Sequence, residues 1–506
     1  MPFNAIFSWY IGKRMKRIEK FRNQPHVCQR EVFSFLTSKL SNTLFSRKLN
    51  LPQIENYEQF KSLVPLQDYG SLMEFIERSR RGEENLLWPG LTSWFAKSSG
   101  TTADRIKILP ITPESLHENH YAGGKDLLAQ YYHNLPNRKL YNAKHLIIGG
   151  SGKLDTSENG VFTGDLSAII INNLPWWTEL RRAPKKEIAL LENWEEKLEK
   201  MARASLNENI CIIAGVPSWT SVLIRRVLEI SGKKNIHEVW PNLELYIHGG
   251  MNFEPYFAKF EQFMGRKIQY VESYNSSEGY FGLQDDYTLN DMLLLTDSQV
   301  FYEFIPMDKF NGTASETVLK LDEIQENIDY ALVISTSAGL WRYIIGDTVR
   351  FSSINPYRFR VTGRTAHFVN AFGEKMIVEH TEKAVASVCQ QMNLTLRDYT
   401  VAPNFKTETS TGNHEWIVEL EEEVFDKQKF GILLDEHLKK VNNDYETKRF
   451  EDINIGFPKI HFAEKGTFEQ WLKMKGRLGG QHKVPRVQNN RKIVDKVLPL
   501  IEILSV

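Results

Sequence analysis

The chain has 506 residues, and its 63 Lys and Arg are balanced by 63 Asp and Glu, so its formal net charge is zero. Hydrophobic residues make up 42% of the chain and charged residues 25%, which is typical of a soluble globular protein. The length suffices for roughly two to four domains. A neutral chain argues against sequence-blind binding of nucleic acid, which requires a basic surface. We therefore expect no nucleic-acid partner.

Three cysteines, Cys28, Cys211 and Cys389, lie far apart and form no CxxC pair. Neither a zinc site nor a disulfide framework is indicated. Scattered thiols fit a reducing compartment, so we expect a cytoplasmic protein. No run of about 18 apolar residues is present, so no membrane span is expected.

The first 80 residues show the periodicity of helices. Within them, residues 7–11 are an apolar patch that several Lys and Arg follow before residue 21. This segment lacks the apolar core and cleavage site of a signal peptide. We favour a helix docked on the body of the protein, and an amphipathic helix on a membrane surface is the alternative.

Residues 98–107, Ser-Ser-Gly-Thr-Thr-Ala-Asp-Arg-Ile-Lys, form a polar stretch between two short apolar segments. The pattern predicts a strand, a loop and a second strand. Hydroxyls and backbone N–H groups on such a loop can wrap phosphate oxygens, which Arg105 or Lys107 can neutralise. A solvated hairpin loop is the alternative, because small polar residues are the usual content of turns.

An α/β pattern follows this loop. Thr112 and Pro113 predict the start of a helix that runs to about Tyr132. Apolar strands are then predicted at residues 145–148, 210–214, 243–247 and 267–271. The last three strands each run into a polar or Gly-rich loop, and ligands of open α/β sheets bind beyond the carboxyl ends of strands.

Residues 290–365 contain several short strand patterns separated by turn residues, which predicts a meander or a β-barrel-like subdomain. From residue 366 the pattern is α+β. We therefore predict an α/β fold with a large N-terminal domain, residues 1–365, whose β-sheets are flanked by helices. A smaller α+β C-terminal domain, residues 366–506, follows it.

The motifs together resemble one known arrangement. Residues 98–107, 274–278 and 343–347 occur in the order and spacing of the nucleotide site of acyl-adenylating enzymes. The chain is similar over nearly its full length to the auxin-responsive acyl acid–amido synthetase family, in particular to its microbial members. The glycines at 249 and 250 and the closing Gln481–Arg486 segment take part in this resemblance.

The resemblance implies roles for individual residues. ATP phosphates would be held by Ser98, Ser99, Gly100, Thr101, Thr102 and Lys107. Tyr274 would stack on adenine, which the Gly249-Gly250 loop borders. Ser276 or Ser277 would meet a phosphate, and Glu278 would bind Mg²⁺. Asp347 would accept hydrogen bonds from the ribose, Arg364 would approach the ribose or phosphate, and Lys483 would face a phosphate from the C-terminal domain.

Two departures from the family pattern stand out. Ala103 and Asp104 occupy loop positions where glycines are usual, and Asp104 would repel a triphosphate unless it points outward. Ile344 replaces a common Arg, so one cation is lost. Neither change touches Glu278 or Asp347.

Each role has a structural alternative. Tyr274 is then core packing, Glu278 caps a helix that starts near Gly279, and Asp347 is a turn acid. Arg342 and Arg364 are then surface salt bridges. The residues proposed for an acyl pocket are Val216, Pro217 and Trp219, and core packing is slightly favoured for them.

The reaction that the resemblance implies has two halves. A small carboxylic acid attacks ATP to give an acyl-adenylate and pyrophosphate, and an amino acid then displaces AMP, with Mg²⁺ as cofactor. Transfer to coenzyme A and an inactive nucleotide-binding or small-molecule-binding homologue are the alternatives. We expect a monomer or weak dimer without membrane contact.

Overall fold

The computed structural model describes residues 2–98, 107–138, 140–150, 154–156, 159–250, 253–365, 368–369, 374, 376–404, 412–442, 445–446, 449, 455–475, 484–488 and 490–504. The chain divides into two compact units. The first contains residues 1–251, 261–345 and 349–361, and the second contains residues 252–260, 346–348 and 362–506.

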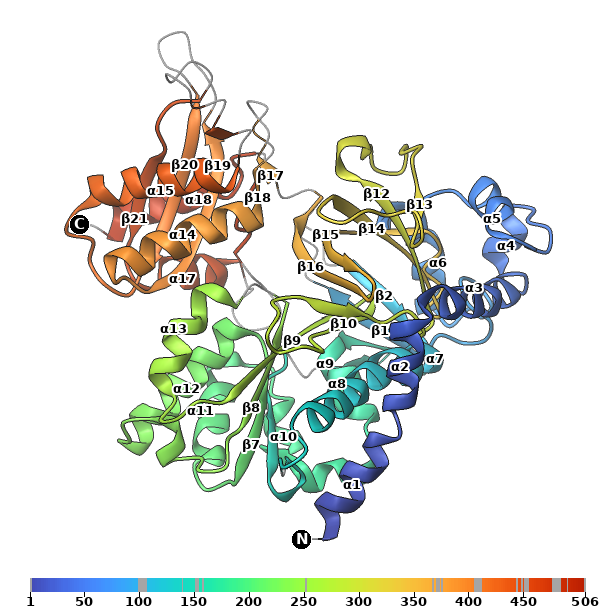
Figure 1. The fold of residues 1–506 in the computed structure, drawn as a ribbon, viewed down its shortest axis with the longest axis horizontal. Helices are drawn as coiled ribbons and strands as arrows, with labels where there is room; N and C mark the ends of the chain where they lie inside the picture. The colour runs from blue at the N-terminus through green and yellow to red at the C-terminus, as the bar shows by residue number, and fades with distance from the viewer. Residues whose placement is uncertain are drawn as a thin grey trace. The chain divides into compact units, whose positions relative to one another are not determined.

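The N-terminal segment of the first unit is helical, as predicted. Its helices are α1 (Pro2–Gly12), α2 (Met15–Asn23), α3 (Pro25–Leu40), α4 (Leu44–Lys48), α5 (Tyr57–Leu63) and α6 (Tyr69–Arg80). Ile11, Ile18 and Phe21 are buried in a core shared with α8, and Arg14 lies 2.6 Å from Asp126. The first helices are therefore docked on the body, and Figure 1 shows α1 and α2 beside α8.

The described strands between residues 94 and 364 form two sheets. The smaller has the order β2-β1-β5-β4, with β1 (Trp94–Ser98), β2 (Lys107–Ile111), β4 (Leu154–Thr156) and β5 (Phe162–Asp165). The helical segment predicted from Thr112 follows β2. It comprises α7 (Pro113–Ser115), a π-helical turn η1 (Leu116–His120) and α8 (Tyr121–Asn134), with Thr112 Oγ1 accepting from Ser115 N.

The larger sheet has twelve described strands in the order β13-β12-β14-β15-β16-β11-β10-β9-β8-β7-β3-β6. Strands β3 (Lys144–Ile147), β7 (Ile210–Ala214), β8 (Leu245–Gly249) and β9 (Gln269–Ser276) are parallel neighbours. The four predicted strands are thus confirmed as the α/β part of the fold, and β6 (Arg182–Ala183) pairs with β3 at its edge.

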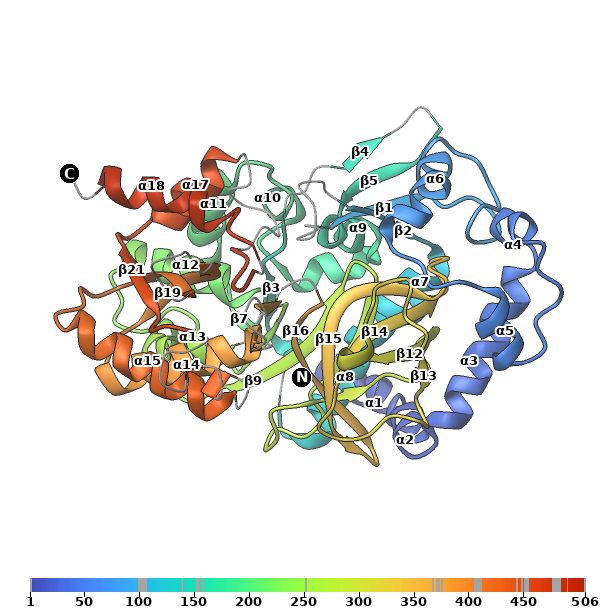
Figure 2. The ribbon, with the colours of Figure 1, turned by 90° about the horizontal axis from the view of Figure 1, so that it is seen from above.

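The meander predicted for residues 290–365 continues this sheet. Strand β10 (Gly279–Leu283) precedes it, and its own described strands are β11 (Met292–Leu294), β12 (Val300–Pro306), β13 (Leu319–Lys320), β14 (Asp329–Thr336), β15 (Tyr343–Ile354) and β16 (Tyr357–Arg364). Residues 343–354 of this segment form one continuous strand, β15. Figure 2 shows α3 and α5 beside β12 and β13, where the Tyr57 hydroxyl donates to Glu303 across 2.9 Å.

Further short elements complete this part of the chain. They are η2 (Leu140–Asn142), α9 (Leu166–Asn173), η3 (Trp176–Arg181), α10 (Lys186–Ala189), α11 (Trp194–Ser205), α12 (Pro217–Ser231), η4 (Ile236–Glu238), α13 (Glu254–Phe263) and η5 (Met307–Lys309). None of the described helices is both long and apolar enough to cross a membrane.

The second unit is α+β. Its main sheet has the order β19 (Leu396–Asn404), β20 (Asn413–Leu420) and β21 (Lys459–Ala463), and β17 (Phe368–Val369) pairs separately with β18 (Met376–Ile377). Its helices are α14 (Val378–Met392), α15 (Lys427–Val441), α17 (Thr467–Met474) and α18 (Val494–Leu504). The predicted fold class is confirmed: a large N-terminal α/β part precedes a smaller α+β part.

Candidate active site

The polar stretch lies at the end of a β-hairpin. Strands β1 and β2 are antiparallel, and their last paired residues are Ser98 and Lys107, which lie directly opposite each other. Phe95 and Leu109 on these strands are fully buried, which fixes the base of the loop in the core. The loop itself, including Ser99, Gly100, Thr101 and Thr102, lies outside the described residues.

Lys107 contacts the third motif. Its Nζ donates to the Tyr343 hydroxyl across 3.4 Å and lies 5.9 Å from the centre of the Tyr343 ring. Tyr343 is the first residue of β15 and is fully buried. A pair of residues 236 positions apart in the chain therefore meets at the base of the polar loop.

The second motif is a tight hairpin turn. Ser276 ends β9 and pairs with Gly279, which begins β10, so Ser277 and Glu278 form a two-residue connection. The Ser276 hydroxyl donates to Glu278 Oε2 across 2.8 Å and accepts from the Glu278 backbone N–H. The suggestion that Glu278 caps a helix is wrong, because a strand begins at Gly279. Only 8% of Glu278 is exposed.

Tyr274 is part of the core. Its ring centre lies 5.0 Å from that of Phe281 and 6.1 Å from that of Phe359, and 7% of the residue is exposed. The same hydrophobic cluster contains Phe95 and Leu109, which flank the first motif on β1 and β2, and Tyr343 of the third motif. Side chains from or beside all three motifs therefore pack into one core in the first unit.

His120 is a buried residue beside the second motif that sequence reasoning missed. Its Nδ1 lies 3.0 Å from Asn275 Oδ1, so this nitrogen carries the proton that the amide oxygen accepts. Its Nε2 is buried and has no hydrogen-bond partner in the described part of the chain. Burial lowers the pKa of His120 to about 4. The sequence offered only a lone histidine on a helix, although π-helical turns such as η1 often lie at functional sites.

Asp347 and Arg364 form an ion pair within the second unit. Arg364 Nε lies 2.9 Å from Asp347 Oδ1, and the Asp347 side chain is buried while 40% of the Arg364 side chain is exposed. Gly346 before them has φ +96°, a conformation that favours glycine. Arg364 therefore makes a salt bridge, as the structural alternative expected. Its partner is Asp347, the residue proposed to bind the ribose.

The neighbouring residues of the third motif are structural. The buried Arg342 guanidinium binds the buried Glu303 carboxylate, with Nε at 3.0 Å from Oε2, so it is not a surface salt bridge. Ile344 packs in an apolar cluster with Leu66 and Val333. A cation at position 344 would lose its hydration there, which explains why the apolar residue is compatible with this fold.

Gly249 is the last residue of β8, and Gly250 follows it. A Cβ at Gly249 would lie 2.2 Å from the carbonyl oxygen of Ser273, so the two strands approach as closely as they do because residue 249 is glycine. Helix α12 begins at Pro217, and Val216 is its N-cap residue. Pro217 is buried, and Val216 and Trp219 are half-buried. Lys483 lies outside the described residues. The described residues contain no group of three or more His, Cys, Asp or Glu that could hold a metal ion.

Comparisons with known proteins decide the family. The family model described as "GH3 family N-terminal domain" matches residues 14–268, the "GH3 family central domain" matches 293–364, and the "GH3 family C-terminal domain" matches 379–492. The chain belongs to the GH3 family. The resemblance seen in its motifs is thereby confirmed.

Curated relatives of this GH3 chain are amide-forming enzymes. It is 24% identical to the indole-3-acetic acid-amido synthetase GH3.4 of Arabidopsis thaliana, over 94% of this chain and 91% of the relative. It is 27% identical to the 4-substituted benzoates-glutamate ligase GH3.12 of the same plant, over 85% and 87%. The GH3 chain is accordingly an enzyme of the ligase class.

Solved structures show the same fold. AtGH3.15 acyl acid amido synthetase in complex with 2,4-DB superposes with a TM-score of 0.79 at 18% identity, covering 97% of this chain and 95% of that one. A 2-hydroxyisobutyryl-CoA ligase in the postadenylation state with R3-HIB-AMP superposes at 0.60 with 10% identity, over 95% and 94%. The fold of this GH3 chain is therefore that of adenylating enzymes.

Proposed function

We propose that this GH3 protein is an ATP-dependent acyl acid–amido synthetase, which adenylates a small carboxylic acid and transfers its acyl group to an amino acid. The observation that best supports this proposal is the hydrogen bond from Lys107 to Tyr343. The Tyr343 side chain belongs to the hydrophobic core into which residues of, or next to, all three motifs pack. It brings a cation of the polar loop to the start of the strand that carries Asp347.

In the first half-reaction, a carboxylate oxygen attacks the α-phosphorus of ATP and pyrophosphate leaves. The polar loop, Ser98 to Lys107, would hold the phosphates, and the Lys107 ammonium would neutralise developing charge. Glu278, with the Ser276 hydroxyl beside it, would hold Mg²⁺, because this ion takes one or two carboxylates together with phosphate oxygens. When bound, Mg²⁺ supplies further charge neutralisation on the phosphates.

The nucleoside would be held by Asp347, whose carboxylate can accept hydrogen bonds from the ribose diol, with Arg364 beside it. Adenine would lie along the Gly249-Gly250 loop and against the small part of Tyr274 that is exposed. Because the Tyr274 ring packs against Phe281 and Phe359, it would contact the edge of the adenine ring with its exposed part.

In the second half-reaction, the nitrogen of an amino acid attacks the acyl carbon and AMP leaves. Lys483 would face the phosphate from the C-terminal part of the chain. An amino acid acceptor is supported by the name of the relative that joins 4-substituted benzoates to glutamate. We place the reaction in the cytoplasm, because the three cysteines are free and buried.

The test is a screen of pyrophosphate release with ATP and Mg²⁺ over a panel of carboxylic acids, followed by product analysis with the best acid. Amides formed with one or more of the twenty amino acids are the expected products. A thioester formed with coenzyme A and no amide would contradict the proposed acceptor. Binding of ATP without release of pyrophosphate for any acid would instead indicate a nucleotide-binding homologue.

A further inference from the structure

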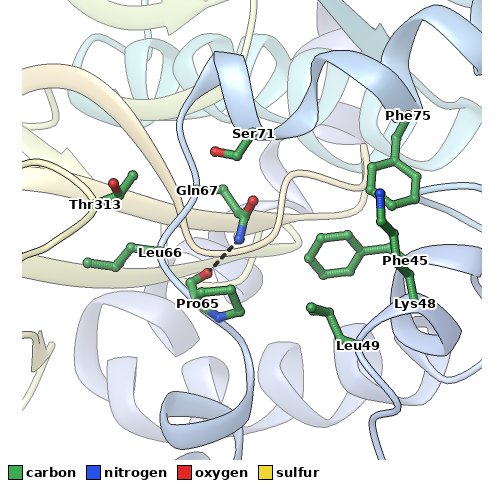
Figure 3. A pocket seen from close by; sticks show the side chains of 9 residues that line it. All are labelled: Phe45, Lys48, Leu49, Pro65, Leu66, Gln67, Ser71, Phe75 and Thr313. Atoms are coloured by element: carbon green, nitrogen blue, oxygen red, sulfur yellow. Dashed lines mark hydrogen bonds between the residues drawn. The ribbon is translucent and has the colours of Figure 1, made fainter.

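A hollow of about 460 Å³ lies in the first unit, and none of the residues that line it belongs to the polar loop, residues 98–107. It is lined by Phe45, Lys48, Leu49, Pro65, Leu66, Gln67, Ser71, Phe75 and Thr313, which Figure 3 shows. Its volume is within the range of pockets that bind small molecules. The proposed reaction places no residue in it.

The floor of the hollow is aromatic. Phe45 from α4 and Phe75 from α6 are almost fully buried, and their ring centres lie 5.6 Å apart in an edge-to-face arrangement. Leu49 and Leu66 add aliphatic surface. An occupant must therefore carry an apolar group, because these walls offer nothing to a polar one.

Gln67 provides a hydrogen-bond acceptor. Only 5% of Gln67 is exposed, and its Nε2 donates to the Pro65 carbonyl across 3.0 Å. Since a carbonyl can only accept, this bond fixes the orientation of the amide. Its Oε1 has no hydrogen-bond partner among the described residues, and Figure 3 shows this oxygen on the side of Phe45 and Phe75.

Lys48 provides a cation at the rim. Of the described side chains that line the hollow it alone is charged. Its Nζ lies 2.8 Å from Glu74 Oε2 and 5.0 Å from the Phe75 ring centre, and 54% of the side chain is exposed. An ammonium has three donors, so Lys48 can bind a second carboxylate while it keeps Glu74.

We infer that this hollow binds an N-acyl amino acid, the conjugate that the proposed reaction produces. The inference rests on the proposed function for the identity of the occupant. The acyl group contacts Phe45 and Phe75, the amide N–H donates to Gln67 Oε1, and the amino-acid carboxylate binds Lys48. The free acid fits less well, because an ionised carboxylic acid has no N–H or O–H to donate to Gln67.

The hollow adjoins the candidate active site through the backbone. Gln67 N donates to Arg342 O across 2.9 Å, and Ile344 N donates to Gln67 O across 2.8 Å. These two residues flank Tyr343, whose hydroxyl accepts from Lys107. A conjugate bound to Gln67 is therefore placed next to the strand that carries the third motif.

The test measures binding to the full chain by calorimetry without ATP. The probes are N-phenylacetylglycine and N-phenylacetylsarcosine, which differ by a methyl group in place of the amide hydrogen. For the unaltered protein we expect the sarcosine compound to bind about 5- to 10-fold more weakly. In Gln67→Leu the two probes should differ less than about twofold, because the acceptor is gone.

Lys48→Met is the second variant, because an exposed residue can be replaced without risk to the fold. It should weaken binding of N-phenylacetylglycine about 2- to 5-fold. Lys200→Met is the matched control: Lys200 is 53% exposed, pairs with Glu196 at 2.6 Å and lies outside the hollow, so affinity should not change. Thermal unfolding of each variant checks that it folds.

Two results would overturn the inference: an affinity that neither Gln67→Leu nor Lys48→Met changes, or no binding of N-phenylacetylglycine at about millimolar concentration. If either result is found while the protein still releases pyrophosphate from ATP with a carboxylic acid, the proposed function stands and the hollow does not bind the conjugate. If both probes bind as expected but no acid releases pyrophosphate, the proposed function fails and the binding site remains.

Discussion

Arg364 Nε lies 2.9 Å from Asp347 Oδ1, so the carboxylate proposed to bind ribose is already paired with a cation that was expected to act separately. Because much of Arg364 is exposed, the pair contributes at most about 1 kcal/mol to stability. Its importance in this account is to position the acid.

Asp347→Asn tests the proposed ribose contact. Hydrogen bonds to a charged group contribute about 1.5–3 kcal/mol, so the KM for ATP should rise about 10- to 100-fold, with little change in thermal stability. Asp329→Asn is the control, because Asp329 pairs with Arg350 in a similar way at 2.6 Å on the preceding strand, β14. Equal effects of the two substitutions on the KM would contradict the assignment.

Lys107→Met tests the cation of the polar loop. If Lys107 neutralises charge in the transition state, pyrophosphate release should slow about 100-fold, and Lys107→Arg should retain more activity. The control is Lys97→Met on the same hairpin, where Lys97 pairs with Asp155 at 2.7 Å. The steady-state rates of Lys107→Met and Lys97→Met are compared at saturating ATP and acid. An unchanged rate for Lys107→Met would show that Lys107 takes no part in the mechanism.

Glu278→Gln tests the proposed magnesium ligand. The substitution keeps the size of the side chain but removes its charge, so about 10-fold or more Mg²⁺ should be needed for half-maximal pyrophosphate release. Ser276→Ala removes the hydroxyl bonded to Glu278 and should shift the Mg²⁺ requirement less. An unchanged Mg²⁺ titration in Glu278→Gln would show that the metal binds elsewhere.

His120 predicts a pH dependence of stability. Burial lowers its pKa to about 4, below the value near 6.5 that it has when unfolded. Between these values the unfolded chain binds the proton and the folded chain does not, so stability falls as the pH falls. From pH 7 to pH 5 this costs about 2 kcal/mol.

The measurement is urea unfolding of the unaltered protein and His120→Gln at both pH values. Glutamine can still donate to Asn275 but does not titrate, so its stability should depend less steeply on pH. The buried His145 and His248 titrate in both proteins and cancel in the comparison. Identical pH slopes for the two proteins would contradict the burial argument.

Gly249→Ala tests the close approach of β8 to β9. The new Cβ would overlap the Ser273 carbonyl, which should lower the free energy of unfolding by about 1–3 kcal/mol. Gly124→Ala is the control, because no atom lies within 4 Å of a Cβ built there in α8. That change should be neutral or stabilise by about 0.5–1 kcal/mol. A neutral Gly249→Ala would mean that the strands separate easily.

Local patterns predicted much of this fold. The strand at 210–214 was predicted with its exact bounds because five apolar residues precede Gly-Val-Pro at a helix start. The helix start at Thr112 followed from its capping hydroxyl and Pro113. Order and spacing of motifs identified the family, because each motif is weak but their sequence along the chain is specific.

Contacts between residues that lie far apart in the chain could not be predicted from the sequence. Glu278 looked able to start a helix, and only its pairing partner across the turn shows that a strand follows. The pair Asp347–Arg364, the burial of His120 beside Asn275 and the acceptor of Gln67 all depend on side chains that the fold brings together. Nothing in the local pattern of these residues distinguishes them from ordinary turn, helix or loop residues.

The most direct test of the central claim is the fate of oxygen from the acid. With a carboxylic acid labelled at both oxygens with ¹⁸O, ATP and an amino acid, the AMP released should contain one ¹⁸O atom, measured by mass spectrometry. This follows because the carboxylate attacks the α-phosphorus and its oxygen leaves with AMP when the amine displaces it. Label in inorganic phosphate with ADP as the other product, or unlabelled AMP, would contradict it.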